Sequence, residues 1–563
     1  MNIKTVRYFV GKMLQVEAAL LALPLIVSFI YQESHTQKLA YAGTILMLLV
    51  IGSLLSFKKP EPLKIMARDG VVTVALSWIL LSFFGGLPFV FTGEIPNVVD
   101  AFFETASGLT TTGSSIIPDL SVLAHSSLFW RSFTHLVGGM GVLVFALAIL
   151  PSHGSESVQL MRAEVPGPVF GKLVSKLAHT AQILYLIYLA MTAVLTIILV
   201  VFQVPLFDAL LLSFGTAGTG GFGINNAGFS IYANPAAVEW IIGVGMMLFG
   251  INFNLYYFVL LGAVKDVIKD EEMRTYVGIV LSFTMIIFTV LTITQTALGV
   301  PIRSVFFTVS SIITTTGYST VDFGLWGVFP HALLLLLMFI GGCAGSTAGG
   351  IKVSRIIVYF KSAIAELKRM GQPRRVFVPT MNGKPIDNKM EKSIANYLIV
   401  YVLFFLVLLL CVSFEAGDFT TAFSSVAATF NNIGPGLGQV GPTSNFSMYS
   451  DFNTFVLAIG MIAGRLEIYP NAYYNYRKHR RAKEVARKQD ILHQIQTIYH
   501  ETNGVAGYRR MRIYLARNGI ELSTLTVHKY MNTELELRSI VRRKAPRYQG
   551  GMQHKKFENL LKQ

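Results

Sequence analysis

Long apolar stretches constrain this chain more than any other feature of its sequence. Two of them, Phe9–Tyr31 and Leu39–Phe57, open the chain, and each has the ~20 residues that a helix needs to cross a bilayer. Of the 563 residues, 53% are hydrophobic and only 14% are charged, and the mean hydropathy is +0.54. Soluble domains carry about 25% charged residues. The sequence therefore predicts an all-α integral membrane protein.

After these two spans a unit repeats four times: a long apolar span, a shorter apolar segment that ends in a glycine-bearing loop, and a second long span. The first spans are Val71–Phe91, Ala181–Phe202, Gly278–Leu298 and Ile394–Phe414. The short segments are Val98–Ser107, Leu206–Phe214, Val305–Ile313 and Phe419–Phe430. The second spans are Leu128–Leu150, Val238–Leu261, His331–Ile340 with the glycine-rich stretch after it, and Phe452–Ile468. The loop glycines Gly113, Gly221, Gly317 and Gly434 stand 108, 96 and 117 residues apart. We expect four pseudo-repeats behind two extra N-terminal helices.

Each loop has the composition of a cation filter. The third reads TTTGYSTVDF, with three threonines before a single glycine and an aromatic residue. Glycine lets the backbone leave the ordinary φ range so that successive carbonyls can point inward, and β-branched threonines stiffen the flanks. A ring of carbonyls can replace the water around a cation. The loops lie near 110–115, 218–223, 314–318 and 431–438, and their predicted ion-binding residues are Thr110, Thr111, Thr112, Gly113, Gly218, Thr219, Gly220, Gly221, Thr314, Thr315, Thr316, Gly317, Tyr318, Asn431, Asn432, Ile433 and Gly434.

The short segments have about ten apolar residues, which is too few to span a bilayer and suits either a buried core helix or a re-entrant helix. Because all four directly precede a Thr/Gly or Asn/Gly loop, the pattern favours re-entrant pore helices whose C-terminal ends face the ion. Basic residues cluster between the units, whereas Arg131 is the exception in the loops after the filters. The positive-inside rule then predicts that the filters open outward and that both termini are cytoplasmic.

The four loops ASGLTTTGSS, GTAGTGGFG, TTTGYSTVDF and NNIGPGLG, together with GGMGVLVFALAILP, FIGGCAGSTAGGIKVSR and GRLEIYP, resemble the potassium transporters of the Trk/Ktr/HKT superfamily. The resemblance covers residues 1–470. It implies potassium uptake across the plasma or inner membrane, a homodimer in contact with membrane lipid, and a cytoplasmic nucleotide-binding regulatory subunit. In that superfamily a Ser at the first filter glycine is associated with sodium, so glycine at all four positions favours potassium.

The resemblance leaves open a passive channel or coupling to Na⁺ or H⁺. We expect no cofactor, no metal beyond the transported cation and no enzymatic activity.

A run of small residues, GGCAGSTAGG at Gly341–Gly350, interrupts the second span of the third repeat. Glycine costs about 1 kcal/mol per position in a helix, so this run predicts a break or kink. Close helix packing through small residues is one interpretation. The resemblance implies another, an intramembrane gate beneath the filter. The predicted gating residues are Gly345, Ser346, Thr347, Gly349, Gly350, Lys352 and Arg465.

Several polar residues in apolar surroundings have two interpretations each. Lys352 lies near the end of a span, where it can act in gating or extend its amine to the membrane surface. Arg465 can gate, or it can form a structural ion pair with Glu467. Asn252 and Asn254 can line a pore or hydrogen-bond between helices. Glu104 is expected near the outer pore.

The last 93 residues differ from the rest in charge. Residues 471–563 hold 20 Lys+Arg and 7 Asp+Glu, a net charge of +13, which leaves 27 basic and 24 acidic residues for 1–470. Ile491–His500, Tyr508–Arg517 and Ser523–Met531 read as three helices, a spacing compatible with a helix-turn-helix; a basic membrane-surface or solvated tail is the alternative.

The tail resembles the N-terminal DNA-binding region of DDE-type insertion-sequence transposases and lacks their catalytic domain. Two segments carry the resemblance, GVAGYRRMRIYLARNGIELSTLTVHKYM and RSIVRRKAPRYQGGMQHKKFENLL.

We therefore expect an N-terminal helix pair at 1–60, a four-repeat cation pore at 61–470 whose last helix is cut short, and a transposase-like DNA-binding fragment at 471–563. Three hypotheses follow: potassium uptake, DNA binding by the tail, and a non-functional fusion product of a disrupted transporter gene.

Overall fold

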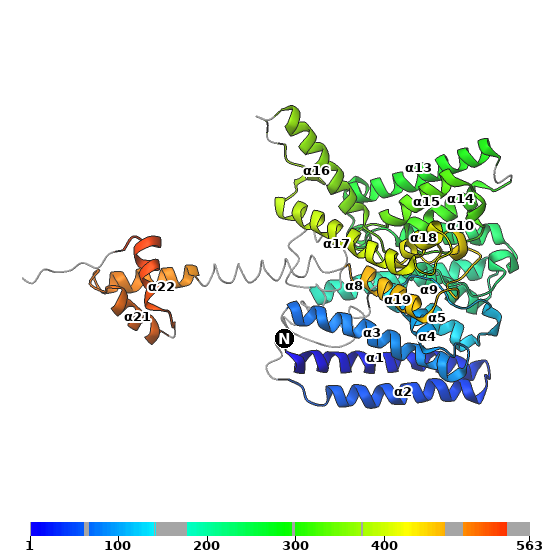
Figure 1. The fold of residues 1–563 in the computed structure, drawn as a ribbon, viewed down its shortest axis with the longest axis horizontal. Coiled ribbons are helices and arrows are strands. Elements are labelled where there is room, and N and C mark those ends of the chain that lie inside the picture. Colours follow the sequence, from blue (N-terminus) through cyan, green and yellow to red (C-terminus); the bar gives the residue numbers. More distant parts are fainter. Residues whose placement is uncertain are drawn as a thin grey trace, which may run out of the picture. The chain divides into compact units, whose positions relative to one another are not determined.

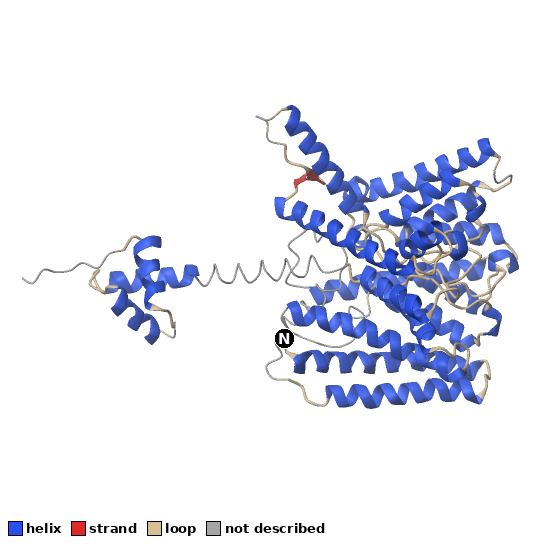
Figure 2. Cartoon of the chain, viewed as in Figure 1, coloured by secondary structure: helices blue, strands red, loops and turns tan. Residues whose placement is uncertain are grey.

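The computed structural model of the chain describes residues 2–60, 67–139, 141, 177–295, 299–372, 375, 377–467, 488–518 and 520–537. The chain divides into two compact units, Met1–Tyr474 and Asn475–Gln563 (Figure 1). Figure 2 shows that helices make up nearly all of the described secondary structure. The described residues contain one small antiparallel hairpin, β1 (Thr380–Met381) with β2 (Lys384–Pro385). The expected all-α fold class is confirmed.

The first unit opens with the expected pair of N-terminal helices, α1 (Ile3–Ile30) and α2 (His35–Ser56), which pack on each other. Four repeats follow, each with a first span, a short helix and a return helix. The first spans are α3 (Ala67–Thr92), α8 (Leu177–Val201), α13 (Glu271–Thr294) and α17 (Asn388–Val412). The short helices are α4 (Val98–Leu109), α9 (Leu206–Gly218), α14 (Ile302–Ile313) and α18 (Phe419–Phe430). The return helices are α5 (His125–Gly139), α10 (Pro235–Phe249), α15 (Val328–Ile340) and α19 (Asp451–Arg465).

A short 3-10 turn lies between each short helix and its return helix: η1 (Leu120–Val122), η2 (Gly228–Ile231), η3 (Phe323–Leu325) and η4 (Gly438–Val440). This shared order of elements confirms the pseudo-repeats at the level of secondary structure.

The packing of the return helices closes the repeats into a ring. Helix α5 packs on α9, α10 on α14, α15 on α18, and α19 on α4, so each return helix contacts the short helix of the next repeat and the fourth contacts that of the first. The N-terminal pair lies beside this ring, because α1 packs on α3 and α5 of the first repeat.

Six described helices are long and apolar enough to cross a membrane: α1, α2, α3, α8, α13 and α17. The prediction of one continuous span from Val238 to Leu261 is wrong. Instead α10 is followed by α11 (Phe253–Leu260) after a bend of 90°. The loop after α15 fills this break, since the Cys343 amide donates to the Gly250 carbonyl at 3.0 Å and the Phe253 amide donates to the Gly345 carbonyl at 3.1 Å. Broken backbone is tolerated at membrane depth where protein satisfies it.

The glycine run breaks the third return helix, as predicted. Helix α15 ends at Ile340, Gly341 adopts a left-handed φ of 74°, and helical structure resumes only at α16 (Val353–Gly371). We call Gly341–Lys352 the small-residue loop. Helix α12 (Val264–Lys269) precedes α13 in the second connection.

The second unit is a small helical bundle with its own core. It contains a helix at 488–501, α21 (Tyr508–Arg517), α22 (Thr524–Lys529) and a π-helical turn η5 (Tyr530–Glu534). Its core includes Ile495, Met511, Leu515 and Val527. Ser523 caps α22, as expected, by accepting a hydrogen bond from the Thr526 amide at 3.2 Å. The three predicted helices are confirmed, whereas the junction at 468–487 lies outside the described residues, as does 142–150, the last part of the first expected return span.

Candidate ion pathway

The four filter loops adopt the same backbone conformation. In each loop two residues that stand two positions apart have positive φ, the second being the glycine chosen from the sequence. The pairs are Thr111 (57°) and Gly113 (79°), Thr219 (57°) and Gly221 (71°), Thr315 (56°) and Gly317 (84°), and Asn432 (58°) and Gly434 (106°). A left-handed conformation is uncommon for threonine and is kept only where the surroundings impose it. The loops are therefore equivalent in structure as well as in position.

One hydrogen bond also recurs in all four loops. The residue before each filter glycine donates its amide to a carbonyl five positions earlier, near the end of the short helix. The bonds run from Thr112 to Ser107 (2.8 Å), Gly220 to Gly215 (2.9 Å), Thr316 to Ser311 (2.9 Å) and Ile433 to Ala428 (2.8 Å). Each of these amides bonds back to the end of the short helix. The carbonyl group of the same residue therefore lies beyond the end of that helix.

These carbonyls meet the glycines of the neighbouring loops in a closed cycle. A Cβ atom built on Gly113 would stand 1.9 Å from the Gly220 oxygen, and one on Gly221 would stand 1.9 Å from the Thr316 oxygen. The corresponding distances are 1.8 Å from Gly317 to the Ile433 oxygen and 2.9 Å from Gly434 to the Thr112 oxygen.

The first loop thus contacts the second, the second the third, the third the fourth, and the fourth the first. Only a residue without a side chain permits such approach at the three closest positions, since real Cβ atoms do not come within 3.0 Å.

Side chains hold the loops in this shape. The Thr110 and Thr112 hydroxyls lie 2.7 Å apart, and the equivalent hydroxyls of the third loop, on Thr314 and Thr316, lie 2.8 Å apart. The fourth loop has Asn431 and Ile433 at these two positions and Asn432 between them. The side-chain nitrogen of Asn432 donates a hydrogen bond to the Thr112 hydroxyl at 2.9 Å and so connects the fourth repeat to the first.

Two further side chains buttress the filters. The Asn431 side-chain oxygen accepts from the Tyr401 hydroxyl at 2.6 Å. Tyr318 is buried, and its hydroxyl lies 2.2 Å from a Cβ built on Gly215 of the second repeat.

The small-residue loop lies directly against the filters. The Gly349 amide donates to the Thr315 hydroxyl at 2.6 Å, and a Cβ built on Gly349 would stand 2.4 Å from the backbone carbonyl oxygen of Asn431. Gly345 and Gly350 have positive φ, 74° and 73°, and Thr347 is buried with its hydroxyl 3.3 Å from the Phe249 carbonyl. The Ser346 hydroxyl donates to the Cys343 carbonyl at 2.7 Å.

The two basic residues predicted to act in gating both bind carbonyls. Arg465 donates to the Thr347 oxygen at 2.8 Å and to the oxygens of Gly138 and Gly139, each at 2.7 Å, so it joins the small-residue loop to the end of α5. Lys352 is only 1% exposed and its amine donates to the Ala348 carbonyl within the loop. Lys352 therefore does not extend to the surface. Glu467 pairs with Arg355.

Asn252 and Asn254 have a local role: the Asn252 side chain caps α11 and accepts from the Asn254 amide at 3.0 Å.

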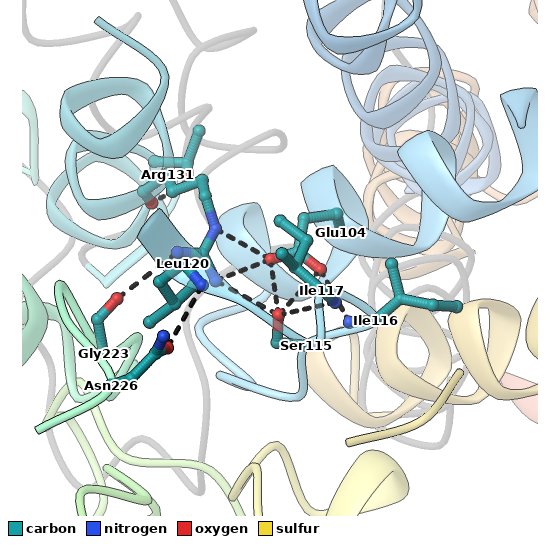
Figure 3. Close-up of polar contacts among 9 residues, drawn as sticks. Glu104, Ser115, Ile116, Ile117, Leu120, Arg131, Gly223 and Asn226 are labelled. Carbon is teal, nitrogen blue, oxygen red and sulfur yellow. Dashed lines mark hydrogen bonds and ion pairs between the residues drawn. The ribbon is translucent and has the colours of Figure 1, made fainter. Parts of the chain in front are cut away.

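A buried ion pair near the first filter was only partly foreseen. Arg131 on α5 and Glu104 on α4 are each at most 2% exposed, and the closest pair of their charged atoms is 2.7 Å apart. Figure 3 shows Glu104 between Arg131 and the segment after the filter, where it accepts from the Ile116 amide at 2.9 Å and the Ser115 hydroxyl at 3.1 Å. Arg131 also donates to the Gly223 carbonyl of the second repeat at 3.3 Å. The lone arginine expected in a loop after a filter was the signal available in the sequence, and the structure places it on α5 instead.

The third repeat has a comparable anchor. Glu239 on α10 pairs with Arg303 on α14 at 2.9 Å and accepts from the Thr320 hydroxyl at 2.7 Å, shortly after the third filter. In the outer turn after the first filter, hydrogen bonds from Ser121 and Asn226 lower the pKa of the Asp119 carboxyl. Nothing in the spacing of these residues along the chain indicates that they meet.

Sequence reasoning also missed Glu272, at the start of α13. Its carboxylate accepts from the Ala344 amide at 2.7 Å and from the Ser354 amide at 3.0 Å. The Ala344 amide lies inside the small-residue loop and the Ser354 amide lies at the start of α16, so one side chain joins the loop to that helix. Within the described part of the chain, no group of three or more His, Cys, Asp or Glu side chains could hold a metal ion.

Four equivalent loops, joined in a ring inside one chain and surrounded by membrane-spanning helices, define a class of membrane proteins that build a cation pore from internal repeats. The chain belongs to the TrkH family of cation transport proteins, which it matches over residues 35–484. Residues 486–545 match an HTH-like domain.

Named relatives agree with this membership. The chain is 36% identical over 477 residues to the Trk system potassium uptake protein TrkH of Salmonella typhimurium, covering 83% of this chain and 97% of the relative. It is 35% identical to the protein of the same name from Escherichia coli K12, with the same coverage. The crystal structure of the potassium transporter TrkH from Vibrio parahaemolyticus superposes with a TM-score of 0.74 at 33% identity, covering 84% of this chain and 98% of that one.

Proposed function

We propose that residues 61–470, together with the helix pair at 1–60, take up potassium ions across the cell membrane through the ring of filter loops. The observation that carries the proposal is the closed cycle in which the carbonyl before each filter glycine lies against the glycine of the adjacent loop. A ring of carbonyl dipoles replaces the hydration shell of K⁺. The short helices end at the filters, so their partially negative C-terminal ends add to the attraction for a cation.

In the proposed mechanism an ion sheds its water at the carbonyls of Thr112, Gly220, Thr316 and Ile433 and then meets the small-residue loop. The glycines leave the backbone of this loop close to the third and fourth filters. The loop acts as the gate, and Arg465 with Lys352 holds it by binding its carbonyls. Release of these contacts would widen the path.

The proposal includes an orientation and partners. Lys58, Lys265, Lys361 and Arg369 lie in the connections between the repeats, and by the positive-inside rule this supports a cytoplasmic side for these connections and for both termini. Apolar side chains exposed on the spans, such as Leu46 and Ile197, suit contact with lipid. A homodimer and a cytoplasmic nucleotide-binding subunit complete the proposal. No coupling ion is assigned.

Growth of a potassium-transport-deficient host at low potassium tests the function, with uptake of rubidium as the direct assay. The full chain should restore growth, and Gly113→Ser should shift preference toward sodium or abolish transport. A wild-type protein that reaches the membrane and supports neither growth nor uptake would overturn the proposal.

The tail at 471–563 supports a second candidate function, DNA binding. Its HTH-like bundle exposes Arg509, Arg510 and Arg512 on α21, so we propose that residues 471–563 retain DNA affinity. Fluorescence anisotropy of a labelled duplex should show salt-dependent binding by the detergent-purified full chain, and a triple alanine variant at these arginines should lose it.

The fusion itself leaves a third outcome, an inactive product whose last helix is cut short near Pro470. Replacement of residues 471–563 by the helical ending of a TrkH relative distinguishes it. If the full chain is inactive and the replacement restores uptake, the disrupted-gene hypothesis is favoured. Equal uptake with either ending would exclude that hypothesis.

A further inference from the structure

A buried carboxyl group without a hydrogen-bond partner lies outside the ion pathway. Glu17 stands in the middle of α1, where a residue is furthest from both membrane surfaces. It is 3% exposed, and neither side-chain oxygen has a partner among the described residues. Intramembrane carboxyl groups are costly and usually serve a function.

Glu17 lines a small cavity between α1 and the first repeat. The wall is apolar except for one hydroxyl, and it consists of Met13, Val16, Leu20, Leu81, Leu109, Trp130, Thr134 and Val137. The space open to the centre of a water molecule is about 10 Å³, which is room for one water. An ionised carboxylate needs several hydrogen bonds, and a metal ion needs several oxygen ligands. The cavity supplies neither.

Two polar groups of the wall are already engaged, whereas the buried hydroxyl of Thr105, whose methyl group lies 2.9 Å from a Cβ built on Gly85, has no partner among the described residues. The Trp130 ring nitrogen donates to the Gly85 carbonyl at 2.9 Å, and the Thr134 hydroxyl donates to the Arg131 carbonyl. Gly85 makes the space for the carboxyl group, because a Cβ at that position would stand 2.8 Å from Glu17 Oε1.

No other titratable side chain lines the cavity. The remaining titratable side chains described on the four surrounding helices are Lys4, Arg7, Tyr8 and Lys12 on α1, Asp69 on α3, Asp100 and Glu104 on α4, and His125, Arg131 and His135 on α5. Lys12 binds Gln15, Glu104 pairs with Arg131, and His135 stacks on Phe222 at 4.4 Å. The charge state of Glu17 therefore depends on its apolar surroundings and on whether the carboxyl group holds a proton, because no neighbouring charge lines the cavity.

We propose that Glu17 is a proton-binding site that links the first filter to pH. With the proton bound, the neutral acid and at most one water fill the cavity, and α1 packs against α3 and α5. Loss of the proton would place a charge against Leu109, the residue immediately before Thr110 of the filter, and against Thr134, whose hydroxyl lies 2.2 Å from a Cβ built on Gly108. Hydration of that charge would open the seam between α4 and α5 and reduce transport.

Infrared spectroscopy of the full chain in liposomes tests the site. We expect the carbonyl stretching band of a neutral carboxylic acid, and this band should disappear in a titration to alkaline pH. Glu17→Gln and Glu17→Leu should remove the band. Glu33→Gln is the matched control, because Glu33 accepts a hydrogen bond from the Ser126 amide at 2.9 Å and its variant should keep the band. The site is wrong if no band depends on Glu17.

Rubidium uptake over the same pH range tests the link, which rests on the proposed transport function. Wild-type uptake should fall at least tenfold with the midpoint of the infrared band, and Glu17→Gln should abolish that fall. A band that persists throughout, or a pH profile that Glu17→Gln does not change, would overturn the link. Absence of wild-type uptake at every pH would instead overturn the transport function, and the infrared result alone would then decide the proton site.

Discussion

The hydrogen bond between the Gly349 amide and the Thr315 hydroxyl connects the small-residue loop to the third filter, and Thr315→Val removes it with almost no change in shape. Valine keeps the β-branch and the backbone carbonyl, so the filter retains its ring. The bond is 2.6 Å long and buried. Leaving a buried donor unsatisfied costs about 1–3 kcal/mol.

That cost falls on the state in which the loop is docked. A difference of about 1–3 kcal/mol changes the ratio of docked to released loop roughly 5- to 150-fold. If the docked loop limits conduction, Thr315→Val should raise the initial rate of rubidium uptake into proteoliposomes by a factor in this range, while the preference for potassium over sodium stays as in the wild type.

Thr111→Val is the matched control. Thr111 occupies the same position in the first filter with nearly the same φ, 57° against 56°, but its hydroxyl has no partner among the described residues. Any effect of this control measures the strain of valine in a left-handed conformation and is subtracted. Equal rates for the two variants would refute the coupling of loop and filter.

Three further predictions concern the supports of the pathway. Glu104→Gln leaves Arg131 buried beside a neutral partner, so it should cost about 3–5 kcal/mol of stability, seen as a lower melting temperature that Arg131→Met in the same chain partly restores; an unchanged melting temperature would contradict this. Gly317→Ala places a methyl group 1.8 Å from the Ile433 oxygen and should abolish rubidium uptake in a protein that still reaches the membrane. Glu272→Ala removes the hydrogen bonds to the Ala344 and Ser354 amides that help to hold the small-residue loop, so it should raise uptake several-fold, with faster hydrogen exchange of the loop amides as the independent readout.

The glycines of the filters show how far sequence reasoning reaches. Their spacing and their threonine or asparagine neighbours singled out four glycines that the structure shows at positive φ, because a positive φ and a missing side chain are local requirements that a sequence expresses directly. The other left-handed residue of each loop, such as Thr219, was included in the predicted filters without its conformation being foreseen. Threonine carries no local signal for that conformation, which the surrounding protein imposes.

The second return helix marks a limit of reasoning from hydropathy. Val238–Leu261 is apolar throughout, so its composition predicts one span, yet the chain bends by 90° between α10 and α11. The partners that make this bend possible, the Cys343 amide and the Gly345 carbonyl, lie more than 90 residues away in the chain. A pattern read along one segment contains no information about such a partner.

Membrane insertion, the four-fold repeat, the filter glycines and the separate basic tail were all determined by the sequence by itself, since each depends on composition or on spacing along the chain. The order of the loops around the ring, the docking of Gly349 on Thr315 and the burial of Glu104 with Arg131 were decided only by the tertiary structure. The physical reason is that these contacts join residues 27 to more than 300 positions apart, within one repeat or between two, where the geometry of packing rather than any local preference selects the partner.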